Sequence, residues 1–104
     1  MAITVQVQDG SARIAMSGRF DFQIHREFKE AYMPLIEDVT VREIEVEMSK
    51  VDYIDSSALG MLMLLNERAK GSNKSVTLLN SSGVVSQVLE VANFSRIFAI
   101  KHAA

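Results

Sequence analysis

Val51-Asp52-Tyr53-Ile54-Asp55-Ser56-Ser57-Ala58-Leu59-Gly60-Met61-Leu62 is the stretch that decides the fold of this chain. A strand-like apolar pattern ends just before it, and an apolar run typical of a helix follows Ser57. The first amides of a helix have no acceptor within the helix, and serine is among the residues that satisfy one of them as the N-cap. The residues therefore predict a strand-to-helix junction with two serines at the helix N-terminus, where serine acts as the cap.

A serine in this position has a second interpretation. The free amides and the positive end of the helix dipole also favour an anion, so a phosphoryl group carried on such a serine would be well tolerated. Asp-Ser-Ser before a helix is, by itself, more typical of a plain cap than of a modification site. The tripeptide alone leaves both interpretations open.

Composition narrows the class of protein. The 104 residues are enough for one domain, residues 1–104, with a core of its own. The absence of cysteine excludes disulfides and thiolate metal sites. A net charge of −2, without a basic cluster, disfavours nucleic acid or an anionic membrane as a partner. The longest apolar run, residues 58–65, is well short of the roughly 20 residues of a membrane span, and the N-terminus does not resemble a signal peptide. We therefore expect a cytoplasmic protein without membrane insertion.

Alternation of apolar and polar residues predicts strands over residues 3–8 and 42–48, and the sequence also predicts strands over residues 12–16, 75–79 and 96–100. Asp9-Gly10 favours a tight hairpin, so an antiparallel pair opens the fold. The first strand is expected to be half-buried. The third carries Glu43, Glu45 and Glu47 on one face, which we interpret as a solvated surface rather than a cation site.

Three helices are expected between these strands. The first runs from residue 20 with Asp21 as its cap, and Pro34 is expected to kink or end it. The second follows the central serines and ends at Gly71. The third is capped by Ser81 or Ser82, and residues 84, 85, 88, 89 and 92 form its apolar stripe, with Asn93 as a left-handed stop.

The element order is therefore β-β-α-β-α-β-α-β, which favours an α/β fold with a mixed sheet and right-handed crossovers. In such sheets, function often sits at the carboxyl ends of parallel strands, where a strand passes to a helix. Asp55-Ser56-Ser57 falls at such an end, and this position favours a functional site there.

Over essentially its whole length, the chain resembles a STAS domain of the bacterial anti-sigma factor antagonist type. The resemblance rests on Gly18-Arg19-Phe20-Asp21, on residues 53–60 around the central serines, and on residues 84–100. It implies that Ser56 is the site of regulatory phosphorylation, with Ser57 as the competing acceptor. It also implies partners: an anti-sigma factor that is a serine kinase of the histidine-kinase-like ATPase type, a metal-dependent serine phosphatase, and a downstream regulator. The unmodified form would bind its partner, and the phosphorylated form would release that partner.

The resemblance also suggests which residues face the partner. These are Asp21, Asp55, Ser56, Ser57, Ala58, Leu59 and Met61. Many relatives carry glycine where this chain has Ala58, and we expect its methyl group to add bulk beside the acceptor and to affect which kinase fits. Phosphate would add about −1.5 to −2 charge beside Asp55, which should weaken docking.

Other classes of function are less well supported. His25 and His102 lack the signature of a catalytic triad, and the glycines form no phosphate-binding loop, so no catalytic activity, cofactor or metal is expected. The main alternative is a constitutive STAS subunit of an ABC-type lipid-transport complex, which the residues do not exclude. A small-ligand sensor is a weaker third. Nothing in the sequence demands more than a monomer.

Overall fold

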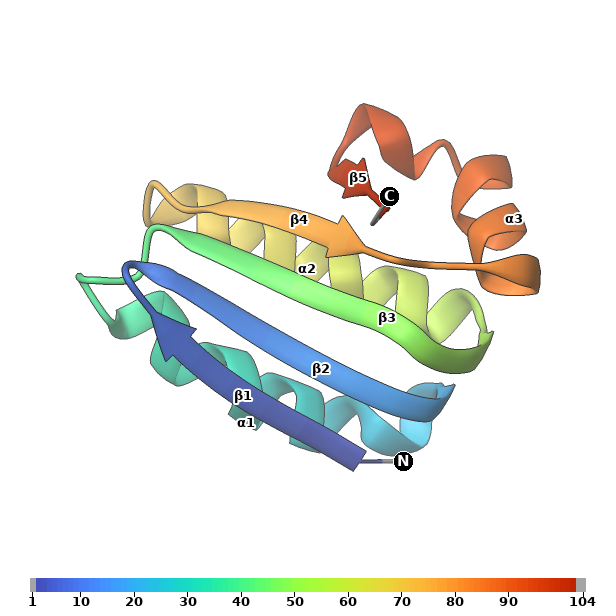
Figure 1. Cartoon of the computed structure of the whole chain (residues 1–104), viewed down its shortest axis with the longest axis horizontal. Helices are drawn as coiled ribbons and strands as arrows, with labels where there is room; N and C mark the ends of the chain where they lie inside the picture. Colours follow the sequence, from blue (N-terminus) through green and yellow to red (C-terminus); the bar gives the residue numbers. More distant parts are fainter. Residues whose placement is uncertain (1, 103–104) are drawn as a thin grey trace.

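The computed structural model describes residues 2–102. A mixed five-stranded sheet runs in the order β1-β2-β3-β4-β5, with β1 antiparallel to β2 and the other neighbouring strands parallel. The elements are β1 (Ala2–Gln8), β2 (Ser11–Phe20), the 3-10 turn η1 (Phe22–Ile24), α1 (His25–Glu37), β3 (Glu43–Ile54), α2 (Ser56–Gly71), β4 (Ser75–Leu79), α3 (Gly83–Val91), the 3-10 turn η2 (Phe94–Arg96) and β5 (Ala99–Lys101). The predicted element order and the opening hairpin are confirmed (Figure 1).

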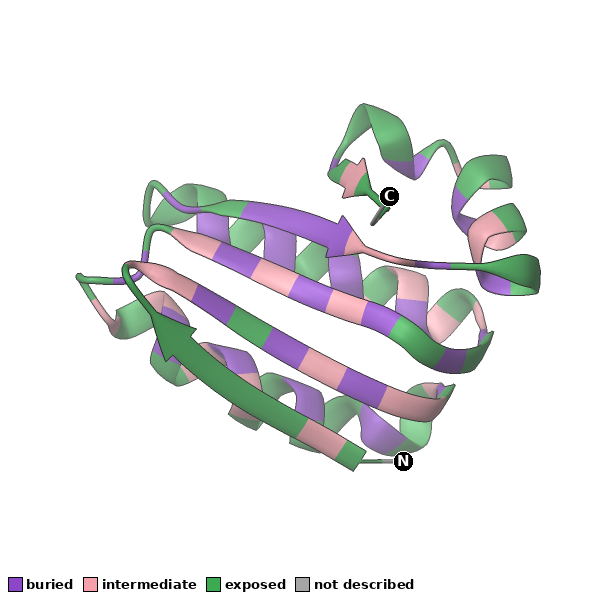
Figure 2. Ribbon diagram, in the orientation of Figure 1, coloured by how far each residue is buried: buried purple, intermediate pink, exposed green. Residues whose placement is uncertain are grey.

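The hairpin depends on its two turn residues. Asp9 has φ +52° and Gly10 has φ +82°, the backbone conformation that a two-residue turn between twisted strands requires. The expectation of a half-buried first strand is wrong, since every residue of β1 except Ile3 is exposed. β1 lies at the edge of the sheet, where its outer side has no neighbour among the described strands (Figure 2).

The sheet separates a buried face from an open one. On the face that α1 and α2 cover, alternate side chains of β2 and β3 form the core: Ala12, Ile14, Met16, Ile44, Val46 and Met48 (Figure 1). The other face carries the three glutamates of β3. These are half-buried and hydrogen-bonded rather than simply solvated. Arg13 on β2 donates to Glu45, Thr77 on β4 donates to Glu43, and Asn80, just after β4, donates to Glu47.

Pro34 does not end its helix. α1 continues to Glu37 with Pro34 inside it, on an exposed position. Tyr32 and Leu35 on either side of it are buried against the core, and Phe28 adds an edge-on ring contact with Tyr32 at 5.4 Å. This packing holds the last turn in helical form despite the hydrogen bond that proline cannot donate.

β3 extends well beyond its predicted end at Met48. β4 stops pairing with it at Leu79, opposite Glu47, and the remainder of β3 runs on to Ile54 beside β2 and contacts α3. Burial alone would raise the pKa of Glu47. Hydrogen bonds from the Ser49 amide at 2.9 Å and the Asn80 side chain at 2.8 Å outweigh burial, and the pKa of this carboxyl lies below its ordinary value.

The last strand is shorter than predicted. The expected left-handed stop is confirmed at Asn93, which has φ +59°, but the chain then forms η2 and enters β5 only at Ala99. Phe94 and Phe98 are both buried, with ring centroids 5.3 Å apart, and the Phe98 amide donates to the Phe94 carbonyl. Aromatic packing at a spacing of four residues therefore favours a helical turn at the start of the segment that was predicted to be a strand.

Candidate functional site

The carboxyl ends of β2 and β3 bring the two aspartates of the predicted site to neighbouring positions. Phe20 and Ile54 are register partners in the parallel pair, and each strand is followed by an aspartate. Each aspartate caps the helical segment that begins there. Asp21 Oδ1 accepts from the Gln23 amide, and Asp55 Oδ1 accepts from the Ala58 amide, both at 3.0 Å.

The N-cap of α2 is therefore Asp55, and the expected serine cap is wrong. Ser56 and Ser57 occupy the first two positions inside the helix. Ser56 is exposed and Ser57 is half-buried. Within residues 2–102, no side-chain hydrogen bond involves Ser56, so its hydroxyl is not occupied by a structural task.

The three apolar residues among those predicted to face the partner differ in their exposure. Ala58 is 0% exposed and packs in the core, so it contributes to the site only through its amide. This differs from the expectation that its methyl group would lie beside the acceptor. Leu59 is half-buried, packed against the core and yet open on one side, and Met61 is similar.

An apolar groove lies beside the start of α2, between it and α3. It has a volume of about 310 Å³ and is lined by Leu59, Val84, Gln87, Val88, Val91 and Ala92. Val84 is 63% exposed and Val91 is 84% exposed. The predicted apolar stripe of α3 is thus only partly a core face, because Val85 and Leu89 supply the buried contacts.

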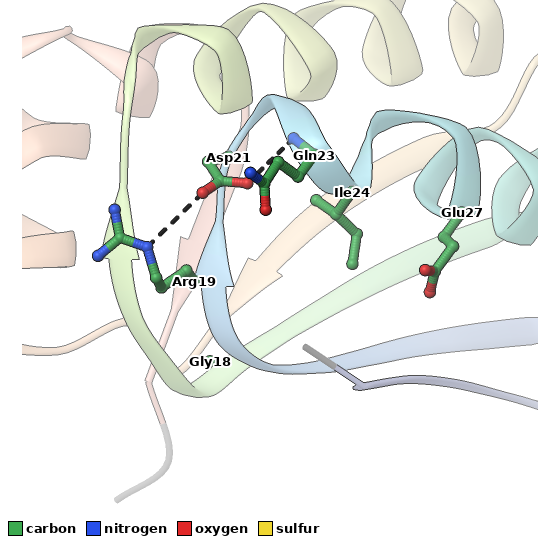
Figure 3. A pocket seen from close by; sticks show the side chains of 6 residues that line it. All are labelled: Gly18, Arg19, Asp21, Gln23, Ile24 and Glu27. Carbon is green, nitrogen blue, oxygen red and sulfur yellow. Dashed lines mark hydrogen bonds and ion pairs between the residues drawn. The ribbon is translucent and has the colours of Figure 1, made fainter.

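On the other flank, Arg19 and Tyr53 form a contact that no local sequence pattern indicates. They are register partners on β2 and β3, and the guanidinium carbon lies 3.8 Å above the ring centroid. Arg19 Nε also lies 3.6 Å from Asp21 Oδ2, an exposed ion pair of small energetic weight (Figure 3). The pairing register was the missing information, since nothing local in the sequence sets Arg19 opposite Tyr53.

Arg19 and Asp21 line a polar cleft of about 420 Å³ together with Gly18, Gln23, Ile24 and Glu27 (Figure 3). Gly18 has φ +93°, a conformation that favours glycine, and it lets β2 turn at this point. Just outside the cleft, Phe22 is 62% exposed and stacks on His25 with ring centroids 4.3 Å apart. An exposed aromatic ring beside Asp21 is a second feature that sequence patterns did not reveal.

The remaining polar clusters offer little chemistry. Among residues 2–102, no group of three or more His, Cys, Asp and Glu side chains is arranged to hold a metal ion. His102 Nε2 lies 3.4 Å from Ser81 Oγ, which in turn bonds Ser86 Oγ at 2.9 Å. Ser81 is buried, and no carboxylate of the described chain is hydrogen-bonded to His102. None of the helices within residues 2–102 combines the length and the hydropathy that a membrane span requires.

This fold and this strand-to-helix junction define a small α/β domain, and a family model identifies it. The model described as the Mlab STAS domain matches residues 3–100, so the chain belongs to the STAS domain family. A STAS-domain containing protein of Pseudomonas aeruginosa (strain UCBPP-PA14) is 41% identical over 102 residues, covering 96% of this chain and 99% of that protein.

Solved structures agree on the fold. A putative anti-sigma factor antagonist from Thermotoga maritima superposes with a TM-score of 0.87 at 20% identity, covering 97% of this chain and 86% of that one. The anti-sigma factor antagonist SpoIIAA in its unphosphorylated form superposes with a TM-score of 0.78 at 18% identity, covering 99% of this chain and 90% of that one. The phosphorylated form of Bacillus SpoIIAA superposes with a TM-score of 0.77 at 17% identity, covering 99% of this chain and 92% of that one. The chain is thus about equally similar to both forms.

Proposed function

We propose that the protein is an anti-sigma factor antagonist that works as a phosphorylation-controlled binding switch. The unmodified form binds a partner regulator, and phosphate on Ser56 releases it. One observation carries this proposal. Ser56 is exposed at the start of α2, and its hydroxyl is not needed to cap the helix because Asp55 does so.

The electrostatics of the junction support release. A phosphate on Ser56 would add about −1.5 to −2 charge directly beside the Asp55 carboxylate, with exposed Asp52 close in the chain. The first amides of α2 and its dipole could hold this charge while it faces water. A partner that covers the site would have to desolvate it, and an unpaired buried charge costs far more than a buried hydroxyl.

The surroundings of Ser56 support protein binding rather than catalysis. The apolar groove between α2 and α3 gives a partner an area to cover, since Leu59, Val84 and Val91 are open to solvent there. On the opposite flank, Asp21 and Arg19 supply polar anchors. Hydrophobic contacts surrounded by polar groups are the usual composition of a protein interface. We include Asp21, Asp55, Ser56, Ser57, Leu59 and Met61 in this surface.

The proposed circuit has three other members, all cytoplasmic. A serine kinase of the histidine-kinase-like ATPase type would add the phosphate and also be the bound anti-sigma factor, a metal-dependent phosphatase would remove it, and a downstream regulator would be freed. The existence of SpoIIAA, a protein of the same fold, in unphosphorylated and phosphorylated forms supports a modification of this kind.

The test uses the unmodified protein as bait in a lysate of its host, followed by affinity measurements on the purified partner. Ser56→Asp is expected to weaken binding by about tenfold or more, whereas Ser56→Ala keeps it. Val39→Asp is the control, since it adds a carboxylate at a valine that is 92% exposed on the loop after α1, outside the proposed surface, and it should keep the affinity. Equal affinities for Ser56→Ala and Ser56→Asp would contradict the proposal.

One observation favours a second candidate. The family model that matches residues 3–100 carries the Mlab name rather than that of an anti-sigma factor antagonist. The alternative is a constitutive subunit that braces an ATPase of a lipid-transport complex, with the apolar groove as a permanent contact. Stable copurification with a transport ATPase that is insensitive to Ser56→Ala and Ser56→Asp would favour this candidate over the switch.

A further inference from the structure

β1 is an unprotected edge of the sheet. All seven of its residues pair with β2, from Ala2 opposite Ser17 to Gln8 opposite Ser11, so its backbone is held in extended form along its full length. On its other side no strand of the described chain lies beside it. Figure 2 shows the strand as an almost uninterrupted exposed ribbon.

The two edges of the same sheet differ in how they are protected. Natural edge strands are usually short, or carry charge, proline or a bulge, since an exposed ladder of backbone groups can pair with another chain. The opposite edge, β5, follows this rule, with three residues and Lys101 among them. β1 is seven residues long, contains no charge and no proline, and pairs with β2 without a register shift.

The side chains of β1 also leave apolar area in contact with water. Val5 is 40% exposed and Val7 is 50% exposed, and both point to the same side of the strand as Ile3. The side chains on the other side, Thr4, Gln6 and Gln8, are polar but uncharged. A partner strand would therefore meet no like charge on either side.

We propose that β1 pairs antiparallel with β1 of a second copy of this chain, about a two-fold axis that passes through Val5. Val5 is the middle residue of the seven-residue strand, so an axis at this position gives every residue of β1 a partner in the other copy. Val5 would lie opposite itself, and Ile3 opposite Val7, which brings the β-branched side chains together on one face. Thr4 would lie opposite Gln6 on the other face. A self-complementary strand of this kind is what a two-fold interface requires.

The dimer would join two five-stranded sheets edge to edge and leave the candidate site open. Ser56 belongs to α2, which follows β3, two strands away from β1 in the sheet. Because the two-fold axis reverses the strand direction, the Ser56 residues of the two copies would lie at opposite ends of the joined sheet. This inference does not depend on the proposed function.

Sedimentation velocity over protein concentrations up to millimolar tests the proposal. The wild type is expected to form a dimer, and Val5→Lys is expected to weaken it by about tenfold or more, since two ammonium groups would face each other on the axis. Val39→Lys is the matched control. It makes the same change at a valine that is 92% exposed on the loop after α1, and it should leave the dimer intact. A monomer at every concentration, or a dimer that Val5→Lys does not weaken, would overturn the proposal.

Cysteine variants test the register without a risk to the fold. The chain has no cysteine, so a single introduced thiol can form a disulfide only between copies. Directly opposed residues in an antiparallel pair have Cα atoms about 4.5 to 5.5 Å apart, within disulfide range. Val5→Cys should therefore crosslink on mild oxidation, whereas Val7→Cys, opposite Ile3 of the other copy, should not. Equal crosslinking of both variants, or crosslinking of Val7→Cys alone, would refute this register.

Discussion

Replacing Asp55 by alanine removes the cap of α2 without touching the core. The Asp55 carboxylate accepts the Ala58 amide at 3.0 Å, a single cap bond from a half-buried side chain. Loss of such a cap costs about 1 kcal/mol, with a range of about 0.5 to 2. For a domain of this size, 1 kcal/mol corresponds to a fall in Tm of roughly 4 to 8 °C.

Ser56→Ala is expected to behave differently. Ser56 lies inside the first turn, where alanine is a better helix former than serine, and no side-chain hydrogen bond within the described residues is lost. Its free energy of unfolding should therefore equal that of the wild type within about 0.5 kcal/mol. Urea denaturation followed by circular dichroism measures both variants under the same conditions.

The comparison separates the two interpretations of the junction. If Ser56→Ala destabilises the protein by about 1 kcal/mol and Asp55→Ala does not, then serine is the cap and the hydroxyl of Ser56 is not available for another role. Asp21→Ala serves as a further control, because it removes an equivalent cap from the three-residue turn η1 rather than from a long helix.

Three further predictions concern groups that are buried or half-buried. Lys74→Met should lower the free energy of unfolding by about 2 to 3 kcal/mol in urea denaturation, because the buried Lys74 ammonium donates hydrogen bonds to the carbonyls of Asp38, at 2.7 Å, and Val41, at 2.6 Å. A loss below about 0.5 kcal/mol would contradict this. The ionised Glu47 carboxylate stabilises the fold at pH values above its ordinary pKa of 4.5, and this stabilisation is lost as the pH falls through the lowered pKa of the folded state. The difference in free energy of unfolding between the wild type and Glu47→Gln should therefore shrink on acidification. A difference that does not change with pH would refute this prediction. Ala58→Gly should cost about 1 kcal/mol in thermal unfolding yet leave partner affinity unchanged, because the methyl group is buried; weaker binding without destabilisation would contradict this.

Local chemistry determined what the sequence could predict. The Asp9-Gly10 hairpin and the left-handed Asn93 each follow from one or two residues with special backbone preferences, and both are confirmed. α2 also ends at Gly71 as predicted, but the left-handed backbone conformation after it belongs to Asn73, with φ +58°, rather than to the glycine. The placement of the central serines at a strand-to-helix junction is likewise confirmed, because the period of the apolar residues changes there.

Tertiary contacts determined what the sequence could not predict. Pro34 remains within α1 because its neighbours are buried, and residues 96–98 leave the strand because Phe94 and Phe98 pack together. The pair of Arg19 and Tyr53 needs the β2–β3 register, and the groove beside Leu59 needs the packing of α3 on the end of β3. These features arise between segments distant in sequence, where periodicity carries no information.

Phosphosite mapping by mass spectrometry on the protein recovered from its native host tests the central claim most directly. We expect phosphate on Ser56 in the wild type, and no phosphate on the chain in Ser56→Ala, since Asp55 rather than serine caps α2 and leaves that hydroxyl accessible. Phosphate on Ser57 alone, or an unmodified chain under every growth condition together with a normal phenotype for Ser56→Ala, would contradict it.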